Sequence, residues 1–206
     1  RLEIAYIISR CLDESLINLR YLLQRDVDNL FDEYIGYSLR EEKRLLNRIQ
    51  GNIIKRGYEL PIESRMISSI NRAFEISSFS PEQVNETKRK PWGEKIYERA
   101  KSIGMEDLYF ALFSLPSHSV HGNWQDLIAF HLEYEKGEFS PRIKWTHLEP
   151  QLLFTAALLS ADSNKLYLNE IIQECPDEDQ IDNLLDDIIL RVRVADELHE
   201  QFLNQE

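Results

Sequence analysis

The chain has 206 residues, 43% of them apolar and 29% charged, which is the composition of a globular protein long enough to bury one helical core. No segment approaches about eighteen uninterrupted apolar residues, which argues against a membrane-spanning helix. The net charge of −12 resides almost entirely in residues 151–206, which carry −10, and the rest of the chain lacks the strongly basic stripe of a dedicated nucleic-acid binder.

Two further features of the sequence restrict the class of protein to which the chain can belong. Cys11 and Cys175 match no metal-ligand spacing, so we expect two reduced thiols in a cytoplasmic protein. The chain begins at Arg1 without an initiator methionine or a signal-peptide pattern, which suggests a fragment of a longer chain. No repeat or boundary divides it, so residues 1–206 are expected to form a single all-helical domain.

The first two predicted helices are long. Residues 2–24 are apolar over most of the helix circumference, which is typical of a central helix. A second helix is predicted over residues 27–54, and because the link is short we expect an antiparallel hairpin. On the first helix, Glu3, Arg10 and Glu14 fall on one narrow stripe, since steps of seven and four residues return near the same face.

The middle of the chain alternates short helices with breakers. Helices are predicted over residues 62–76, 92–103 and 105–114, and residues 77–91 are a polar surface connection. Pro116 disfavours helical conformation in the residue before it, so we expect the chain to bend there.

The stretch after this bend is the most informative in the chain. His118 and His121 stand three residues apart, with Gly122 just after them. On a helical turn, residues at i and i+3 share a face, so both imidazoles could meet one ligand. A zinc site needs a third ligand, and the nearest carboxylates, Asp107 and Asp126, match no known spacing. The sequence therefore predicts no metal and no cofactor.

The last third of the chain contains two more long helices. Asn123 is predicted to cap a helix that runs through residue 132. A short hairpin is expected within residues 133–145, and helices are predicted over residues 150–174 and 179–203. The fold class is thus all-α, a single bundle of about seven to eight helices.

One polar site can be assembled from these elements. We expect Arg10 of the first helix to face the Pro116 bend and to form a site with Glu14 and His121. In a catalytic version, His121 or His118 is the general acid or base and Arg10 stabilises developing negative charge. The alternative is structural: an Arg10–Glu14 surface pair worth about 0.2–0.5 kcal/mol, and a histidine that hydrogen-bonds the backbone at the bend.

Two markers in the chain carry a family resemblance. The first helix holds Arg10, Glu14 and the run Tyr21-Leu22-Leu23, and a later segment holds Tyr109, Ser114 and then His121-Gly122. In order and spacing these residues resemble DUF5677, a bacterial family of helical domains of unknown function. That family is distantly similar to the HEPN class of helical bundles, which implies an all-helical fold.

The HEPN similarity also implies an activity. Many HEPN proteins are ribonucleases of toxin–antitoxin and phage-defence systems, in which an arginine precedes a histidine by four to six residues. This chain departs from that pattern, because the nearest arginine before His118 is Arg99. In a nuclease, Arg10 or Arg1 would need to lie near the histidine in the folded protein and replace the missing arginine.

Three functions follow as expectations. The leading one is a cytoplasmic binding or regulatory domain of a bacterial stress or phage-defence system. The alternatives are a metal-independent HEPN-like ribonuclease and a structural protein–protein interaction domain whose acidic C-terminal helix docks a basic partner. Whether the chain is an enzyme stays open. We expect a homodimer or a protein partner, and RNA is a partner that the net charge does not support.

Overall fold

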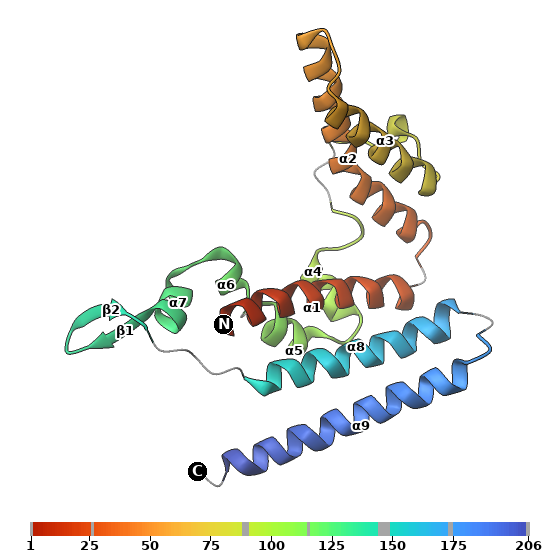
Figure 1. The fold of residues 1–206 in the computed structure, drawn as a ribbon. Helices are drawn as coiled ribbons and strands as arrows, with labels where there is room; N and C mark the ends of the chain where they lie inside the picture. Colours follow the sequence, from red (N-terminus) through yellow and green to blue (C-terminus); the bar gives the residue numbers. More distant parts are fainter. Residues whose placement is uncertain are drawn as a thin grey trace. The chain divides into compact units, whose positions relative to one another are not determined.

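The structure is a computed structural model and describes residues 2–25, 27–87, 91–114, 116–143, 149–172 and 175–204. The described chain is helical apart from one small two-stranded sheet (Figure 1), so the predicted all-α class is confirmed. It forms two compact units, residues 1–25 with 96–206 and residues 26–95. The single domain over residues 1–206 stays a prediction. None of the described helices is long and apolar enough to cross a membrane.

The first unit is built around α1 (Leu2–Gln24). This helix packs against α8 (Pro150–Ile171) and α4 (Ile96–Ser102), and Ile17 at its centre is 1% exposed. A helix that is apolar over most of its circumference needs partners on several sides, and α1 has them. Its predicted central position is therefore confirmed within this unit.

The C-terminal helix α9 (Glu178–Leu203) runs alongside α8 in Figure 1. Lys165 of α8 joins the two helices, with its Nζ 3.1 Å from a carboxylate oxygen of Asp182 and 2.6 Å from one of Asp186. No described residue of α9 is fully buried. The acidic charge of this helix thus lies at the surface, where water solvates it.

Between α4 and α8 the first unit contains several short elements. In chain order they are α5 (Glu106–Leu108), the π-helix η2 (Tyr109–Ser114), α6 (Ser117–His121), α7 (Trp124–Asp126) and the π-helix η3 (Leu127–His131). The strands β1 (Leu132–Glu135) and β2 (Glu138–Pro141) follow as an antiparallel hairpin. Its two-residue turn has positive φ at both central residues, 53° at Lys136 and 88° at Gly137, as tight hairpins favour. The predicted hairpin is confirmed.

The second unit consists of α2 (Leu30–Arg56), α3 (Pro61–Ile76) and the 3₁₀ turn η1 (Pro81–Gln83). It has a core of its own, in which each of these side chains is at most 5% exposed: Leu39, Leu46, Ile49, Ile70, Phe74 and Val84. The helix α2 ends at Gly57, whose φ of 82° is a conformation that glycine adopts without strain.

Two predictions of local structure need correction. The expected hairpin of residues 2–24 with 27–54 joins the two units and stays a prediction. The helix expected over residues 92–103 begins only at Ile96. The helices expected over 105–114 and up to 132 each start as a short α-turn and continue as π-helix, and the second ends at His131.

Candidate functional site

Arg10 connects α1 to the chain just after Pro116. Its Nε donates a hydrogen bond of 3.0 Å to Oγ of Ser117, and its guanidinium lies 4.3 Å from the centroid of the Phe113 ring. Its Nη1 is 3.5 Å from Oε2 of Glu14, one helical turn further on. The charge of Arg10 is thus shared between a carboxylate and an aromatic face, and the side chain is held in one direction.

The two histidines of the predicted site have different surroundings. His118 is half-buried, and its Nδ1 accepts a hydrogen bond from the side-chain amide of Asn123. His121 is exposed, and among the described residues it has no hydrogen bond or ion pair with Arg10 or Glu14. The structure therefore brings Arg10 and Glu14 together, without a hydrogen bond or ion pair to His121.

His118 instead borders a cavity of about 390 Å³ within the first unit. Elements from α1 to α8 contribute to its wall. The apolar part of the lining is Ala111, Leu112, Ala129, Phe130 and Leu152, and the polar part is Tyr6, His118, Ser119, Gln125, Asp126, Glu149, Gln151 and Thr155. A cavity of this size that combines apolar and polar side chains lies within the range of small-molecule sites.

The cavity is electronegative. Asp126 and Glu149 contribute two carboxylates, whereas no lysine or arginine is among the described residues that line it. The Tyr6 hydroxyl donates a hydrogen bond of 2.5 Å to Oε2 of Glu149. Burial, followed by this hydrogen bond and the nearby negative charge, raises the pKa of Tyr6 to about 12, so the phenol keeps its proton at neutral pH.

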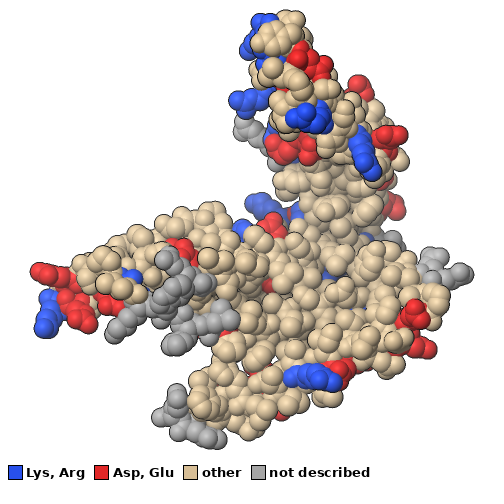
Figure 2. Space-filling model, viewed as in Figure 1, with Lys and Arg blue, Asp and Glu red and all other residues tan. Residues whose placement is uncertain are grey.

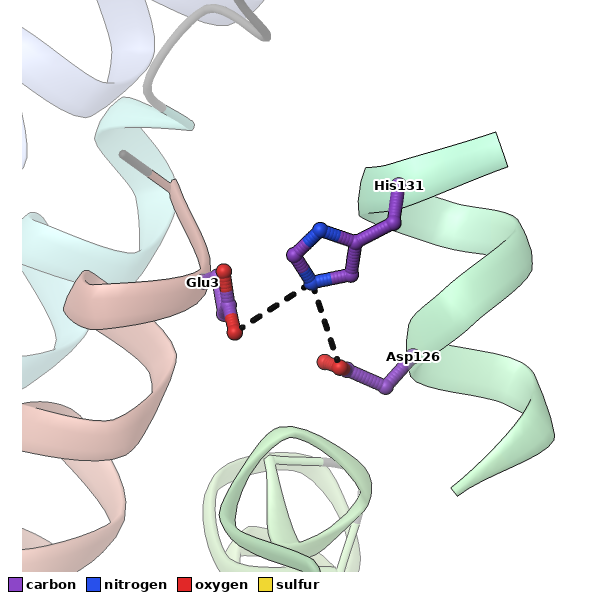
Figure 3. Close-up of side chains that lie close together, drawn as sticks. All are labelled: Glu3, Asp126 and His131. Atoms are coloured by element: carbon purple, nitrogen blue, oxygen red, sulfur yellow. Dashed lines mark ion pairs between the residues drawn. The ribbon is translucent and has the colours of Figure 1, made fainter. Parts of the chain in front are cut away.

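A cluster of three ionisable side chains, Glu3, Asp126 and His131, adjoins the cavity through Asp126 (Figure 3). Nε2 of His131 lies 3.4 Å from Oε1 of Glu3 and 3.6 Å from Oδ2 of Asp126. Asp126 is only 3% exposed, and its Oδ1 has no hydrogen-bond partner among the described residues. A buried carboxylate oxygen that accepts no hydrogen bond raises the free energy of the folded state, so its burial needs an explanation.

Local backbone structure determines this arrangement. Oδ1 of Asn123 accepts a hydrogen bond from the N–H of Asp126 at 3.2 Å, which begins α7 as the sequence predicted. The following turn is π-helical, with the N–H of Leu132 bonded to the carbonyl of Leu127. Bonding from i to i+5 places residues five apart on one face, and Asp126 and His131 are five apart. Both can therefore point toward Glu3.

Arg142 supports the same turn from the strand side. Its Nη1 donates a hydrogen bond of 2.5 Å to the carbonyl of Ala129, and its Nη2 donates one of 3.4 Å to that of Ile128. The backbone N–H of Arg142 also donates to the carbonyl of His131 at 2.8 Å. These bonds satisfy carbonyls that the end of a helix leaves free, and they hold His131 in place.

Sequence reasoning singled out only part of this cluster. Glu3 lies on the predicted stripe with Arg10 and Glu14, and Asp126 is a carboxylate close in sequence to the histidines, whereas no sequence pattern marks His131. In an α-helix, residues five apart differ by about 140° in direction, so the α-helical period separates Asp126 from His131. A sequence signal for a π-turn would have predicted that Asp126 and His131 lie close together.

The comparisons with known proteins place the chain in a family without giving it a function. Residues 1–139 match the family described as a family of unknown function, DUF5677. No curated protein and no solved structure matches the chain.

Proposed function

The chain belongs to DUF5677, a family of unknown function, and from this premise we propose that its first unit is a binding domain for a small organic cation. The ligand would enter the cavity of about 390 Å³ and place an ammonium or guanidinium group against Asp126 and Glu149. The proposal rests on one observation: these two carboxylates and two aromatic side chains, Tyr6 and Phe130, line the same cavity.

The size of the cavity supports a small molecule. Known ligand pockets measure about 300–1,000 Å³, so this chamber is at the lower end of the range. The apolar wall of Leu112, Phe130 and Leu152 suits a short hydrocarbon chain, which gains free energy when it leaves water.

The polar and aromatic groups support a positive charge on the ligand. The rings of Tyr6 and Phe130 lie 5.9 Å apart between centroids, and both line the cavity. A cation is attracted to the face of an aromatic ring, and a nearby carboxylate adds to the attraction. A phosphate would instead meet two negative charges without a lysine or arginine among the described lining.

The same charge argument bears on the ribonuclease alternative. On the face drawn in Figure 2, acidic and basic side chains alternate over α2 and α3, and no continuous basic stripe is seen there. Arg10 is engaged by Ser117, Glu14 and Phe113, and no hydrogen bond or ion pair among the described residues joins it to His121. The ribonuclease, the interaction domain, the defence setting and the homodimer stay predictions, and the cation-binding proposal requires none of them.

Calorimetry with putrescine, a four-carbon diamine, tests the proposal. We expect saturable binding of putrescine and none of 1,4-butanediol, which has the same length without charge. Glu149→Gln should weaken putrescine binding at least tenfold, because it removes one carboxylate while keeping the shape of the side chain.

The control is Glu135→Gln, which removes an equal charge from the exposed strand β1 and should leave the affinity unchanged. Equal weakening by both variants would show that only the net charge of the protein matters. That result, or equal binding of the diamine and the diol, would reject the proposal.

A further inference from the structure

We propose that Glu3, Asp126 and His131 form a binding site for one divalent transition-metal ion of the Zn²⁺ class. The three side chains come from the first turn of α1, the end of α7 and the end of η3 (Figure 3). The site shares Asp126 with the cavity, whereas Glu3 and His131 do not line it, so a variant of His131 tests the metal site without changing the cavity lining.

The distances fit a shared ion better than direct contacts. A charge-assisted N–H···O hydrogen bond measures about 2.7–2.9 Å, whereas Nε2 of His131 lies 3.4 Å and 3.6 Å from the two carboxylates. Ligands about 2.1 Å from a tetrahedral zinc ion are about 3.4 Å from one another. The separations therefore leave room for an ion among the three atoms.

The burial of Asp126 points to the same conclusion. Its side chain is 3% exposed, and Oδ1 has no hydrogen-bond donor among the described residues. The close partners of its carboxylate are a second carboxylate, Glu3, and a histidine that is cationic only when protonated. A dication balances the two negative charges and supplies the bond that Oδ1 or Oδ2 otherwise lacks.

The types of ligand select the class of metal. One imidazole nitrogen with two carboxylate oxygens suits zinc and similar transition metals, whereas Mg²⁺ and Ca²⁺ favour sets made of oxygen alone. Three protein ligands leave the fourth tetrahedral position to water or to another small ligand, as in zinc sites that are not purely structural.

The surrounding backbone supports the three ligands. The Asn123 cap begins the turn that carries Asp126, and Arg142 bonds the carbonyls beside His131. Single π-turns inside helices occur frequently at functional sites, and this one aligns the two ligands on η3 and α7. A fixed outer shell of this kind is what metal ligands need to keep their orientation.

The test is calorimetric titration of chelator-treated protein with ZnCl₂. We expect one ion per chain for the wild type and a loss of affinity of at least about 100-fold in His131→Ala. His121→Ala is the matched control, because it removes an exposed histidine from a nearby helix and should bind zinc like the wild type. Cys11 and Cys175 are present in all three proteins, so their contribution cancels.

Three further measurements make the result easier to interpret. Glu3→Gln replaces a half-buried ligand on the first turn of α1 and should reduce zinc affinity. Co²⁺ should give the intense visible absorption of a tetrahedral site in the wild type and lose it in His131→Ala. Putrescine binding should survive in His131→Ala, which separates this site from the proposed ligand cavity.

The proposal is overturned by a zinc stoichiometry near zero in the wild type. It is equally overturned if His131→Ala and His121→Ala bind zinc alike, since the binding would then come from elsewhere in the chain. Weak, octahedral-type absorption of the Co²⁺ protein would contradict the tetrahedral geometry.

Discussion

Asp13 is the residue whose surroundings conflict most with its charge. It is 2% exposed on α1, and only Oδ2 is hydrogen-bonded, by Oγ of Ser9 at 3.2 Å, while Oδ1 has no partner among the described residues. Burial raises the pKa of Asp13 from 3.8 to about 6, although the Ser9 hydrogen bond lowers it in part. The buried carboxylate therefore opposes folding at neutral pH.

The direction of the pH dependence follows from proton binding. Between about pH 4 and pH 6, the folded chain keeps the Asp13 proton and the unfolded chain has lost it, so stability falls as the pH rises. Above that window both states are ionised and the penalty is complete. A pKa shift of about two units corresponds to at most about 3 kcal/mol of unfolding free energy.

Asp13→Asn should therefore stabilise the protein at pH 7.5 by up to about 3 kcal/mol, since it removes the charge and keeps the shape. Denaturant unfolding at pH 4 and pH 7.5 measures the free energy of unfolding of both proteins. The increase caused by Asp13→Asn should be smaller at pH 4. The exposed Asp28→Asn should show little gain at either pH. A gain for Asp13→Asn that does not change with pH would contradict the assigned cause.

At the scale of elements, the Asn123 cap controls the short helix that carries Asp126. Asn123→Ala removes the acceptor of the Asp126 N–H and the amide that bonds His118, and should cost about 1 kcal/mol. Hydrogen exchange should accelerate in residues 124–131, because the free N–H groups of the first turn lose their cap. Thermal melts and exchange of the variant measure both effects.

Asn52→Ala is the matched control, because Asn52 is exposed within α2 and alanine is the better helix former. It should leave exchange in residues 124–131 unchanged. Equal exchange in that segment for the wild type and Asn123→Ala would show that the cap does not hold the turn.

The long helices could be predicted from sequence, and the site could not. Apolar periods of three and four residues locate α1, α2, α3, α8 and α9 closely, since burial and α-helical geometry impose that period. Arg10 and Glu14 are one turn apart, so their pairing is a local property. The Glu3–Asp126–His131 cluster depends on a π-turn and on tertiary packing, and neither leaves a periodic pattern.

At the scale of the whole chain, the hydrophobic residues divide into two groups. Ile17, Ala100 and Met105 form a buried cluster in the first unit, and a separate cluster around Leu39, Ile70 and Phe74 forms in the second. The short link after residue 24 predicts a hairpin connection, and each long helix on either side also packs within its own unit. Periodicity shows that a helix buries a face, and it does not show which partner covers it.

The two cores allow a test of whether the chain unfolds as one domain. Phe74 is 2% exposed, so Phe74→Ala should cost about 3–5 kcal/mol through lost burial and a residual cavity. Because that core contains only residues of the second unit, we expect faster hydrogen exchange in α2 and α3 and unchanged exchange in α1 and α8. Phe31→Ala is the control, since Phe31 is 61% exposed and its loss should alter neither unit. A uniform rise over α1, α2, α3 and α8 would instead establish the single cooperative domain that the sequence predicts.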